Sequence, residues 1–176
     1  GGGGKCGGAG ATASSAEAAG PVRGWRICRQ PFATTALDGI GGLYVGGRWH
    51  RRGRPIVYTA SSAALAALEV LVHVDPLEAP EDLRLLTLEL PDDLLIERIE
   101  TAALPVRWLA VPAPDELALL GAEWLASRRT AALSVPSAVI PIERNLLLNP
   151  LHPAIAQVRI TDDQPFSFDP RLLRDG

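Results

Sequence analysis

The sequence is poor in cysteine and has no long hydrophobic run. Of its 176 residues only Cys6 and Cys28 are cysteines, one in a Gly-rich tail and one in a candidate strand. They offer neither a disulfide framework nor a paired metal-binding motif, so we expect a reducing, cytoplasmic environment. No apolar run approaches the roughly 18 residues of a spanning helix, and the N-terminus lacks the basic-then-apolar order of a signal peptide. These absences favour a protein that is neither membrane-bound nor exported.

Lysine is nearly absent as well. Of 17 basic residues only Lys5 is a lysine, so the others are arginines. Such a bias can reflect genomic base composition, and it weakens any one cluster of arginines as evidence for phosphate recognition.

Charged residues make up 21% of the chain and the net charge is -3, an average globular balance. This balance and the lack of a recognition-helix pattern argue against direct nucleic-acid binding.

What the chain does have is enough apolar residues for one core. With 176 residues, 47% of them apolar, it is too short for two ordinary domains, and no repeat recurs along it. Residues 1–20 are almost entirely Gly, Ala, Ser and Thr, a composition that cannot offset the entropy cost of folding. We therefore predict a flexible segment over 1–20 and a single domain over 21–176.

The spacing of apolar residues, glycines and prolines predicts short strands and two helices. The helices are expected over 61–73, capped by Ser61 or Ser62, and over 114–129, with arginines in the last turn. A Gly-rich loop is expected over 38–47. Because helices precede most of the strands, the predicted class is α+β. The expected strands are 25–28, 55–59, 83–90, 131–135, 138–142 and 157–160.

The first predicted helix carries a carboxylate, Glu69, among apolar residues. Apart from Glu69 and the terminal His73, every position after the cap is apolar, which predicts a buried helix. At about 100° per residue, Glu69 lies beside a stripe formed by Leu65, Leu68 and Val72. Burying a lone ionised carboxylate is costly, so Glu69 must pair with a cation, be protonated or face a cleft. A structural ion pair with an arginine and a catalytic carboxylate both stay open at this point.

The segment 23–54 is strongly basic and rich in glycine, with a single acid, Asp38. Arginine side chains beside Gly-rich loops suit phosphate or pyrophosphate, because glycine lets backbone amides approach an anion and arginine supplies paired donors. Neither the P-loop nor the GxGxxG pattern is present, so no particular nucleotide fold is indicated. The arginines of this segment are Arg23, Arg26, Arg29, Arg48, Arg51, Arg52 and Arg54.

Other polar residues carry weaker signals. Tyr58 lies just before the Glu69 helix, where it could stack on a flat ring or serve as a core aromatic. Ser134 and Ser137 flank Pro136 and suit a turn. The three histidines show no HExxH spacing, so we expect no zinc site, and the absence of a GxSxG motif gives nucleophilic hydrolysis no support.

Several longer motifs occur together in a recognisable order. The chain reads WRICR, then GGRWHRRGRPIVYTASSAALAALEVLVH, then VPSAVIPIERNLLLNP and LHP, and ends in PFSFDPRLL. Over 25–173 it closely resembles the RES domain, the toxin half of RES-Xre toxin–antitoxin systems. The resemblance implies a fold like that of diphtheria-toxin-type ADP-ribosyltransferases. It also implies an enzyme that breaks the bond between nicotinamide and ribose in NAD+.

The resemblance assigns roles to five residues. By motif, the two arginines of the family site correspond to Arg26 and Arg48, the tyrosine to Tyr58, the glutamate to Glu69 and the serine to Ser137. The arginines would hold the pyrophosphate of NAD+, and Tyr58 would stack on nicotinamide. Glu69 would stabilise the positive charge that develops on the ribose, and Ser137 would orient Glu69 or the ribose. His50 stands where the family usually has Asn after GGRW, which puts a polar contact from that position in doubt.

The resemblance also implies partners. NAD+ is expected as the substrate, with no separate cofactor and no metal, and an Xre-type helix-turn-helix antitoxin as the protein partner; homodimers are a habit of the family. If water or phosphate accepts the ADP-ribosyl group, the protein is an NAD+ glycohydrolase or phosphorylase that depletes NAD+. If a protein accepts it, the chain is an ADP-ribosyltransferase. An inactive nucleotide-binding module is a third alternative, against which the intact set of Arg26, Arg48, Tyr58 and Glu69 argues.

Overall fold

The computed structural model describes residues 21–75 and 78–173, and within them seven strands form one sheet. The strands are β1 (Val22–Arg29), β2 (Val57–Ala60), β3 (Leu83–Leu90), β4 (Ile96–Arg98), β5 (Ala132–Pro136), β6 (Arg144–Leu148) and β7 (Arg159–Phe166). Their order in the sheet is β4-β5-β6-β2-β1-β3-β7, and neighbours are antiparallel except β4 and β5.

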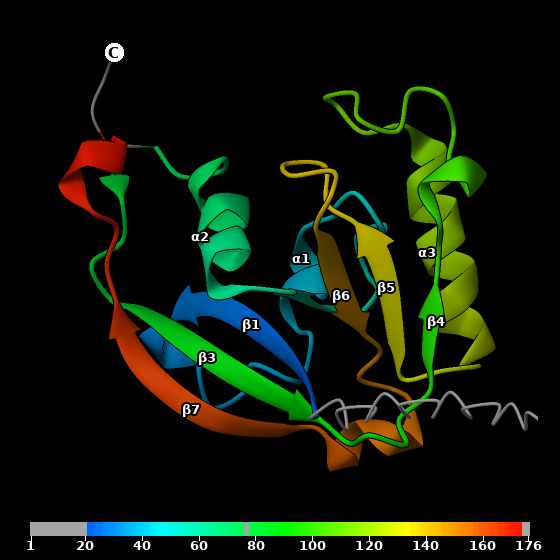
Figure 1. Ribbon diagram of the computed structural model, residues 1–176, viewed down its shortest axis with the longest axis horizontal. Helices are drawn as coiled ribbons and strands as arrows, with labels where there is room; N and C mark the ends of the chain where they lie inside the picture. Colours follow the sequence, from blue (N-terminus) through cyan, green and yellow to red (C-terminus); the bar gives the residue numbers. More distant parts are fainter. Residues whose placement is uncertain (1–20, 76–77, 174–176) are drawn as a thin grey trace, which may run out of the picture.

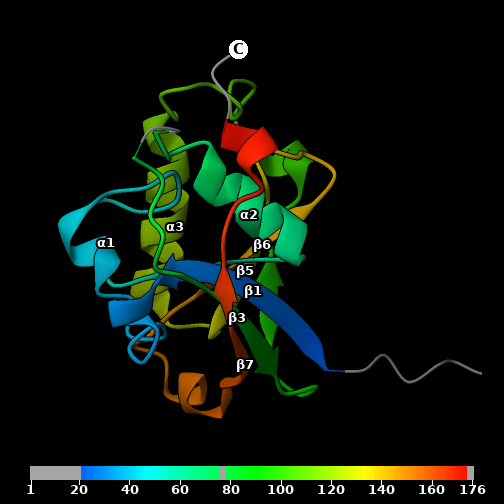
Figure 2. The same ribbon diagram turned by 90° about the vertical axis from the view of Figure 1, so that its left-hand side faces the viewer.

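The described α-helices lie between strands along the chain, and the predicted α+β class is confirmed. The α-helices are α1 (Gly41–Tyr44), α2 (Ala63–Leu71) and α3 (Asp115–Ser127). Short 3-10 helices are η1 (Gln30–Phe32), η3 (Thr101–Ala103), η4 (Pro153–Gln157) and η5 (Pro170–Leu173). Helix α2 packs on the half of the sheet that contains β1, and α3 packs beside β4 and β5 (Figures 1 and 2).

The two halves of the sheet meet at a narrow junction between β1 and β2. Strand β1 pairs with β3 along its whole length, whereas β1 and β2 share the residue pair Trp25 and Ala60. Figure 1 shows β1, β3 and β7 running at an angle to β4, β5 and β6. The junction therefore lets side chains of β1 and β2 meet where the sheet changes direction.

Helix α2 begins at a cap that also fastens it to the sheet. Ser62 has an extended backbone, and its Oγ accepts a hydrogen bond from the backbone N–H of Leu65 at 3.1 Å, as the sequence predicts. The same hydroxyl donates to Glu143 at 2.9 Å, and the backbone N–H of Ser61 donates to the carbonyl of Arg144. The first turn of α2 is thus anchored at the start of β6.

The prediction that α2 is a buried helix is wrong for half of its surface. Leu65 and Ala66 are buried against the β1 half of the sheet, but Leu68 is partly exposed and Val72 is 57% exposed. The helix lies at the surface and packs through one side, so an apolar composition did not place it inside the core. Glu69 is partly exposed as a result.

Helix α3 lies directly on the segment that carries Arg48 and His50. A Cβ atom on Gly121, in the middle of α3, would collide with the backbone carbonyl of Trp49. Glycine therefore permits this close approach. The helix ends at Ser127, followed by a left-handed Arg128. The two arginines expected in the last turn thus lie just beyond it.

Several predicted strands need correction. The segment 138–142 is a loop, because the Ser137 hydroxyl accepts hydrogen bonds from the backbone N–H groups of Val139 and Ile140 and turns the chain. Ile142 at its tip is 94% exposed. The strand at this place is β6, which the sequence reading missed along with β4. The prediction for 83–90 is confirmed at both ends, 157–160 marks only the beginning of β7, and the Gly-rich loop contains α1.

The expectations about a membrane-spanning helix and a metal site can be compared with the described residues only. None of the helices within 21–75 and 78–173 is long and apolar enough to cross a membrane. The same residues contain no group of three or more His, Cys, Asp or Glu side chains that could hold a metal ion. The predicted flexible segment 1–20, with Lys5 and Cys6, lies outside the described residues. Cys28 is a free thiol whose pKa is raised mainly by burial.

Candidate functional site

Glu69 is held through one of its two carboxylate oxygens. Ser137 Oγ donates to Glu69 Oε1 at 2.8 Å, and Asn145 Nδ2 donates to the same oxygen at 2.6 Å. Both donors are buried. Among the described residues no cation forms a salt bridge with Glu69, so the structural ion pair left open by the sequence is not formed. Neutral donors therefore fix the carboxylate in place without a directly bound countercharge.

Ser137 lies in a turn that occupies the acceptor positions of its hydroxyl. The hydroxyl hydrogen is therefore directed to Glu69. Ser137 is completely buried, and its backbone N–H donates to the carbonyl of Glu143 at 3.0 Å. Its Oγ accepts from the backbone N–H groups of Val139 and Ile140, each at 3.0 Å. Because a hydroxyl has one hydrogen and two acceptor positions, the hydrogen is left for Glu69.

Tyr58 lies on β2 with its hydroxyl enclosed by the backbone and one histidine. The hydroxyl oxygen accepts from the backbone N–H of Trp49 at 3.1 Å and lies 2.9 Å from His50 Nδ1. His50 Nε2 lies 3.0 Å from the carbonyl of Val45. Burial lowers the pKa of His50 and raises the pKa of Tyr58 well above its usual range, so both side chains are neutral.

Arg48 reaches across to the loop that precedes α3. Its Nη1 donates to the carbonyl of Trp108 at 2.5 Å and its Nη2 to the carbonyl of Ala110 at 3.3 Å. Burial lowers the pKa of Arg48, while the negative charge of Glu69 raises it, so Glu69 lies within electrostatic range of Arg48. Since guanidinium has five N–H donors, three remain for another acceptor.

Arg26 joins this group from β1, across the junction of the sheet. Its Nη1 donates to the backbone carbonyl of Tyr58 at 2.9 Å. Its Nε is buried and has no hydrogen-bond partner among the described residues. Desolvation lowers the pKa of Arg26. Arg26 is thus linked to Tyr58 through the backbone and has no described contact with Glu69.

The structure adds two residues that the sequence reading did not place in the site. Asn145 holds Glu69, and His50 holds the Tyr58 hydroxyl. Asn145 stands before three leucines in β6, and a polar residue at the start of an apolar strand was the signal that could have found it. The only signal at His50 was that the family usually has Asn at this position. His50 nevertheless makes a polar contact, with the Tyr58 hydroxyl.

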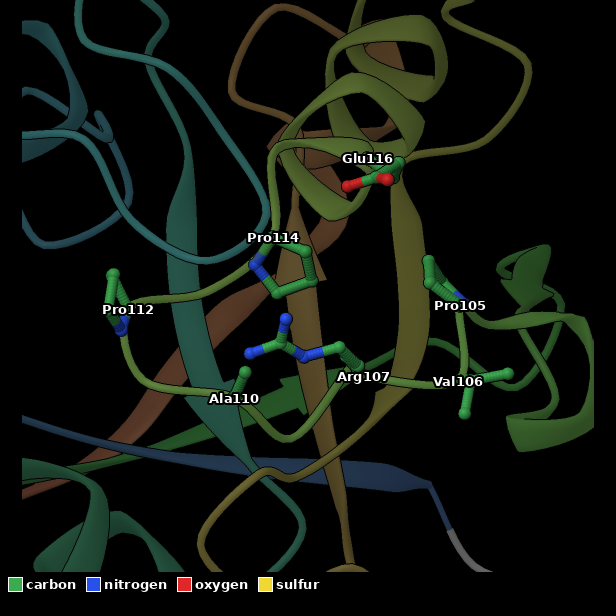
Figure 3. Close-up of a pocket in the computed structure, with 7 residues that line it drawn as sticks. All are labelled: Pro105, Val106, Arg107, Ala110, Pro112, Pro114 and Glu116. Atoms are coloured by element: carbon green, nitrogen blue, oxygen red, sulfur yellow. The ribbon is translucent and has the colours of Figure 1, made fainter.

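A pocket of about 370 Å³ lies beside the loop that Arg48 holds. Figure 3 shows the Arg107 side chain pointing toward Ala110 and Pro114, with Glu116 at the start of α3. Ala110, which lines this pocket, also accepts a hydrogen bond from Arg48. None of the five predicted site residues lines the pocket. Its lining residues are Pro105, Val106, Arg107, Ala110, Pro112, Pro114 and Glu116.

Comparison with known proteins gives one consistent family. Residues 23–169 match the RES domain family. A "Prs ADP-ribosylating toxin" of Sphingobium sp. is 40% identical over 154 residues, which cover 85% of this chain and 96% of that protein. A "Toxin Res" of Pseudomonas putida is 42% identical over 151 residues, which cover 85% of this chain and 98% of that protein.

A solved structure is similar as well. The match is a chain of the M. tuberculosis MbcT-MbcA toxin–antitoxin complex, with a TM-score of 0.61, 20% identity and 87% of each chain covered. At this identity the likeness shows a shared fold. The family match and the relatives, which the chain covers over nearly their whole length, show more: the chain belongs to the RES domain family.

Proposed function

We propose that this RES-domain protein is the toxin of a toxin–antitoxin pair and that it cleaves NAD+ at the bond between nicotinamide and ribose. The observation that carries the proposal is the arrangement of Glu69. Its Oε1 is fixed by Ser137 and Asn145, its Oε2 has no hydrogen bond from a described residue, and the charge of Arg48 lies within electrostatic range. A fixed, partly exposed carboxylate can meet a developing positive charge without reorganising.

The reaction needs such a carboxylate. When the glycosidic C–N bond breaks, its electron pair leaves with nicotinamide, which departs neutral, and positive charge develops on the ribose at C1′. Glu69 stabilises that charge, as carboxylates do in glycoside hydrolysis. A nucleophile then bonds to C1′ and releases its proton. Because Ser137 and Asn145 are neutral donors, they orient Glu69 without cancelling its charge.

The other predicted residues suit the remaining parts of NAD+. A pyrophosphate can accept hydrogen bonds from both arginines. Arg26 has an unpartnered Nε–H, and Arg48 has three unused N–H groups. The hydroxyl of Tyr58 is engaged by His50 and Trp49, so its contribution is the aromatic ring, which stacks on nicotinamide. Arg26 and Arg48 would hold one end of the substrate while Tyr58 and Glu69 hold the bond that breaks.

A second activity, ADP-ribosyl transfer to a protein, is supported by one observation. The Sphingobium relative, 40% identical, is named an ADP-ribosylating toxin. The same site serves both reactions, because the acceptor supplies the nucleophile that attacks C1′. The partner we propose is an Xre-type helix-turn-helix antitoxin; the solved structure that shares this fold is a toxin–antitoxin complex.

The test is release of nicotinamide from NAD+ by the purified protein, with and without phosphate. Glu69→Gln keeps the volume of the side chain and removes its charge, so the rate should fall by about 100-fold or more. Glu123→Gln, the same change at an exposed position of α3, is the matched control and should keep the rate. A rate that rises with phosphate, with a phosphorylated ADP-ribose product, identifies phosphorolysis.

The same experiment separates the alternatives. If nicotinamide is released only when a cell extract is added, and labelled ADP-ribose appears on a protein of the extract, the activity is protein ADP-ribosylation. If Glu69→Gln releases nicotinamide as fast as the unchanged protein, Glu69 is not the catalytic carboxylate. If neither release nor labelling occurs, the chain is a binding module and the proposal is wrong.

A further inference from the structure

Asn145 has a buried polar atom that no described residue satisfies. The residue is 9% exposed, and its Nδ2 is committed to Glu69 Oε1 at 2.6 Å. Its Oδ1 is buried and has no hydrogen-bond partner among the described residues. Buried carbonyl oxygens in native proteins are rarely left unpaired, because the hydrogen bonds lost to water are then not replaced. Next to a candidate catalytic carboxylate, such an atom marks a place for a donor from the ligand.

The orientation of the Asn145 amide is fixed by chemistry. An ionised carboxylate has no hydrogen to donate, so the NH₂ end of the amide must face Glu69 and the oxygen must face away. The backbone is equally constrained, because β6 pairs on both sides, with Asn145 opposite Ala60 of β2 and Val135 of β5. The free Oδ1 is therefore a stable feature of the site.

Asn145 Oδ1 is one of two unpaired acceptor atoms on side chains that contact each other. Glu69 Oε2 also has no hydrogen bond from a described residue, and the two side chains are joined through Oε1. Two unpaired acceptors on linked side chains suit two donors on one ligand, and the hydroxyls on neighbouring carbons of a ribose are such donors.

We propose that Asn145 is a substrate-binding residue. One ribose hydroxyl donates to Asn145 Oδ1 while the neighbouring hydroxyl donates to the Glu69 carboxylate. The inference rests on the proposed function, because the ribose in question is the one bound to nicotinamide. A neutral amide suits this position: it binds the hydroxyl and leaves the negative charge of Glu69 available to the developing cation.

The test measures binding to ligands that are not cleaved. In carba-NAD+ a cyclopentane carrying the same two hydroxyls replaces the nicotinamide ribose, and two analogues each lack one of these hydroxyls. Calorimetry should show that the unchanged protein binds carba-NAD+ about tenfold or more tightly than either analogue, the usual effect of one lost hydrogen bond to a buried or charged group. Asn145→Leu, similar in shape without polar atoms, should lose the preference for one hydroxyl and keep the other.

Asn149 at the end of β6 provides a matched control. It is completely buried, but its Nδ2 donates to the carbonyl of Leu125 and its Oδ1 accepts from the backbone N–H of Leu151, so both ends are satisfied. Asn149→Ala should lower the melting temperature and keep both hydroxyl preferences. If Asn145→Leu does not melt cooperatively, Asn145→Ala takes its place.

The outcomes separate this inference from the proposed function. Equal affinity of the unchanged protein for carba-NAD+ and both analogues, or no binding of any of them, overturns the inference. So does an Asn145 variant that keeps both preferences, since Oδ1 is then satisfied by something other than the ligand, such as a water molecule. Nicotinamide release without a hydroxyl preference contradicts the inference alone, and a hydroxyl preference without release contradicts only the proposed function.

Discussion

His50 and Tyr58 share a hydrogen bond whose direction is set by the backbone. The carbonyl of Val45, 3.0 Å from His50 Nε2, can only accept, so Nε2 carries the hydrogen of the neutral ring. Nδ1 is then an acceptor, and the Tyr58 hydroxyl, 2.9 Å away, donates to it. The backbone N–H of Trp49 donates to the same oxygen. Because the hydroxyl hydrogen of Tyr58 is donated to His50, it is not available to a substrate.

This direction predicts that the ring of Tyr58, and not its hydroxyl, serves the reaction. Tyr58→Phe should keep nicotinamide release within a few-fold, while Tyr58→Leu, which removes the ring, should lower it by about tenfold or more. Tyr58→Phe also leaves His50 Nδ1 and the Trp49 N–H unpaired, which should cost about 1–3 kcal/mol of stability. Rates and urea unfolding of the two variants are the measurements. A Tyr58→Phe protein that is stable and inactive would show that the hydroxyl takes part in the chemistry.

The buried, neutral His50 predicts a pH dependence of stability. Burial lowers the pKa of folded His50 below its ordinary value of 6.5. Below pH 6.5 the unfolded chain therefore binds the proton more readily than the folded one. The contribution of His50 to stability is fully present above pH 6.5 and is lost as the pH falls through the lower pKa of the folded state.

The comparison that isolates this effect uses His50→Asn, which keeps a donor and an acceptor but does not titrate. Urea unfolding of both proteins from pH 8 to pH 5 should give a stability difference that moves in favour of the variant as the pH falls. The carboxylates, Arg48 and Tyr58 are present in both proteins, so their contributions to the pH dependence of stability cancel in the difference. Parallel curves over this range would mean that the pKa of His50 is the same in the folded and unfolded chain.

The five site residues stay a prediction, whereas the predicted strands can be compared with the structure directly. Tyr58, Glu69 and Ser137 lie in motifs that a resemblance can align, and the structure joins Glu69 and Ser137 by a hydrogen bond. Arg26 is the exception, because its position depends on how the two halves of the sheet meet. That junction is a tertiary feature, and no local pattern of apolar residues encodes it.

What the sequence did not reveal has separate physical causes. The run 138–142 has strand-like composition, but a single buried hydroxyl, Ser137 Oγ, caps its backbone and makes it a loop. The strand β4 has three residues and gives too short a pattern to detect. Asn145 escaped notice because its importance lies in a contact across 76 positions of the chain, to Glu69.

Gly121 is predicted to be required for the packing of α3 under the site. In Gly121→Ala the added Cβ meets the backbone carbonyl of Trp49, which cannot move aside as a flexible side chain could. Overpacking of this kind should cost about 1–3 kcal/mol and displace the segment of Arg48 and His50, so that activity falls as well. Gly41→Ala in α1 is the control, because its Cβ would have no neighbour within 4 Å. Thermal melting of both variants tests this, and equal melting temperatures would contradict it.

Arg48 is predicted to hold the loop before α3 in addition to any role in binding NAD+. It donates to the carbonyls of Trp108 and Ala110, and the peptide bond that joins Arg107 to Trp108 lies directly before this segment. Trypsin cuts after arginine where the backbone can leave its folded conformation. Arg48→Ala should therefore raise the rate of tryptic cleavage after Arg107 by several-fold, because two hydrogen bonds that restrain the loop are removed.

The matched control for Arg48→Ala is Arg51→Ala. Arg51 forms an exposed ion pair with Asp115 at 3.5 Å, and pairs of this kind contribute little to stability, so its loss should leave cleavage after Arg107 unchanged. Mass spectrometry of the fragments identifies the cut. If Arg48→Ala weakens NAD+ binding without faster cleavage, the loop is held by its other contacts, and Arg48 serves the substrate alone. The alternative result has two parts: Arg48→Ala is cleaved faster, and NAD+ slows cleavage of the unchanged protein but not of Arg48→Ala. Arg48 would then have both roles, since binding of the ligand and restraint of the loop would depend on the same guanidinium.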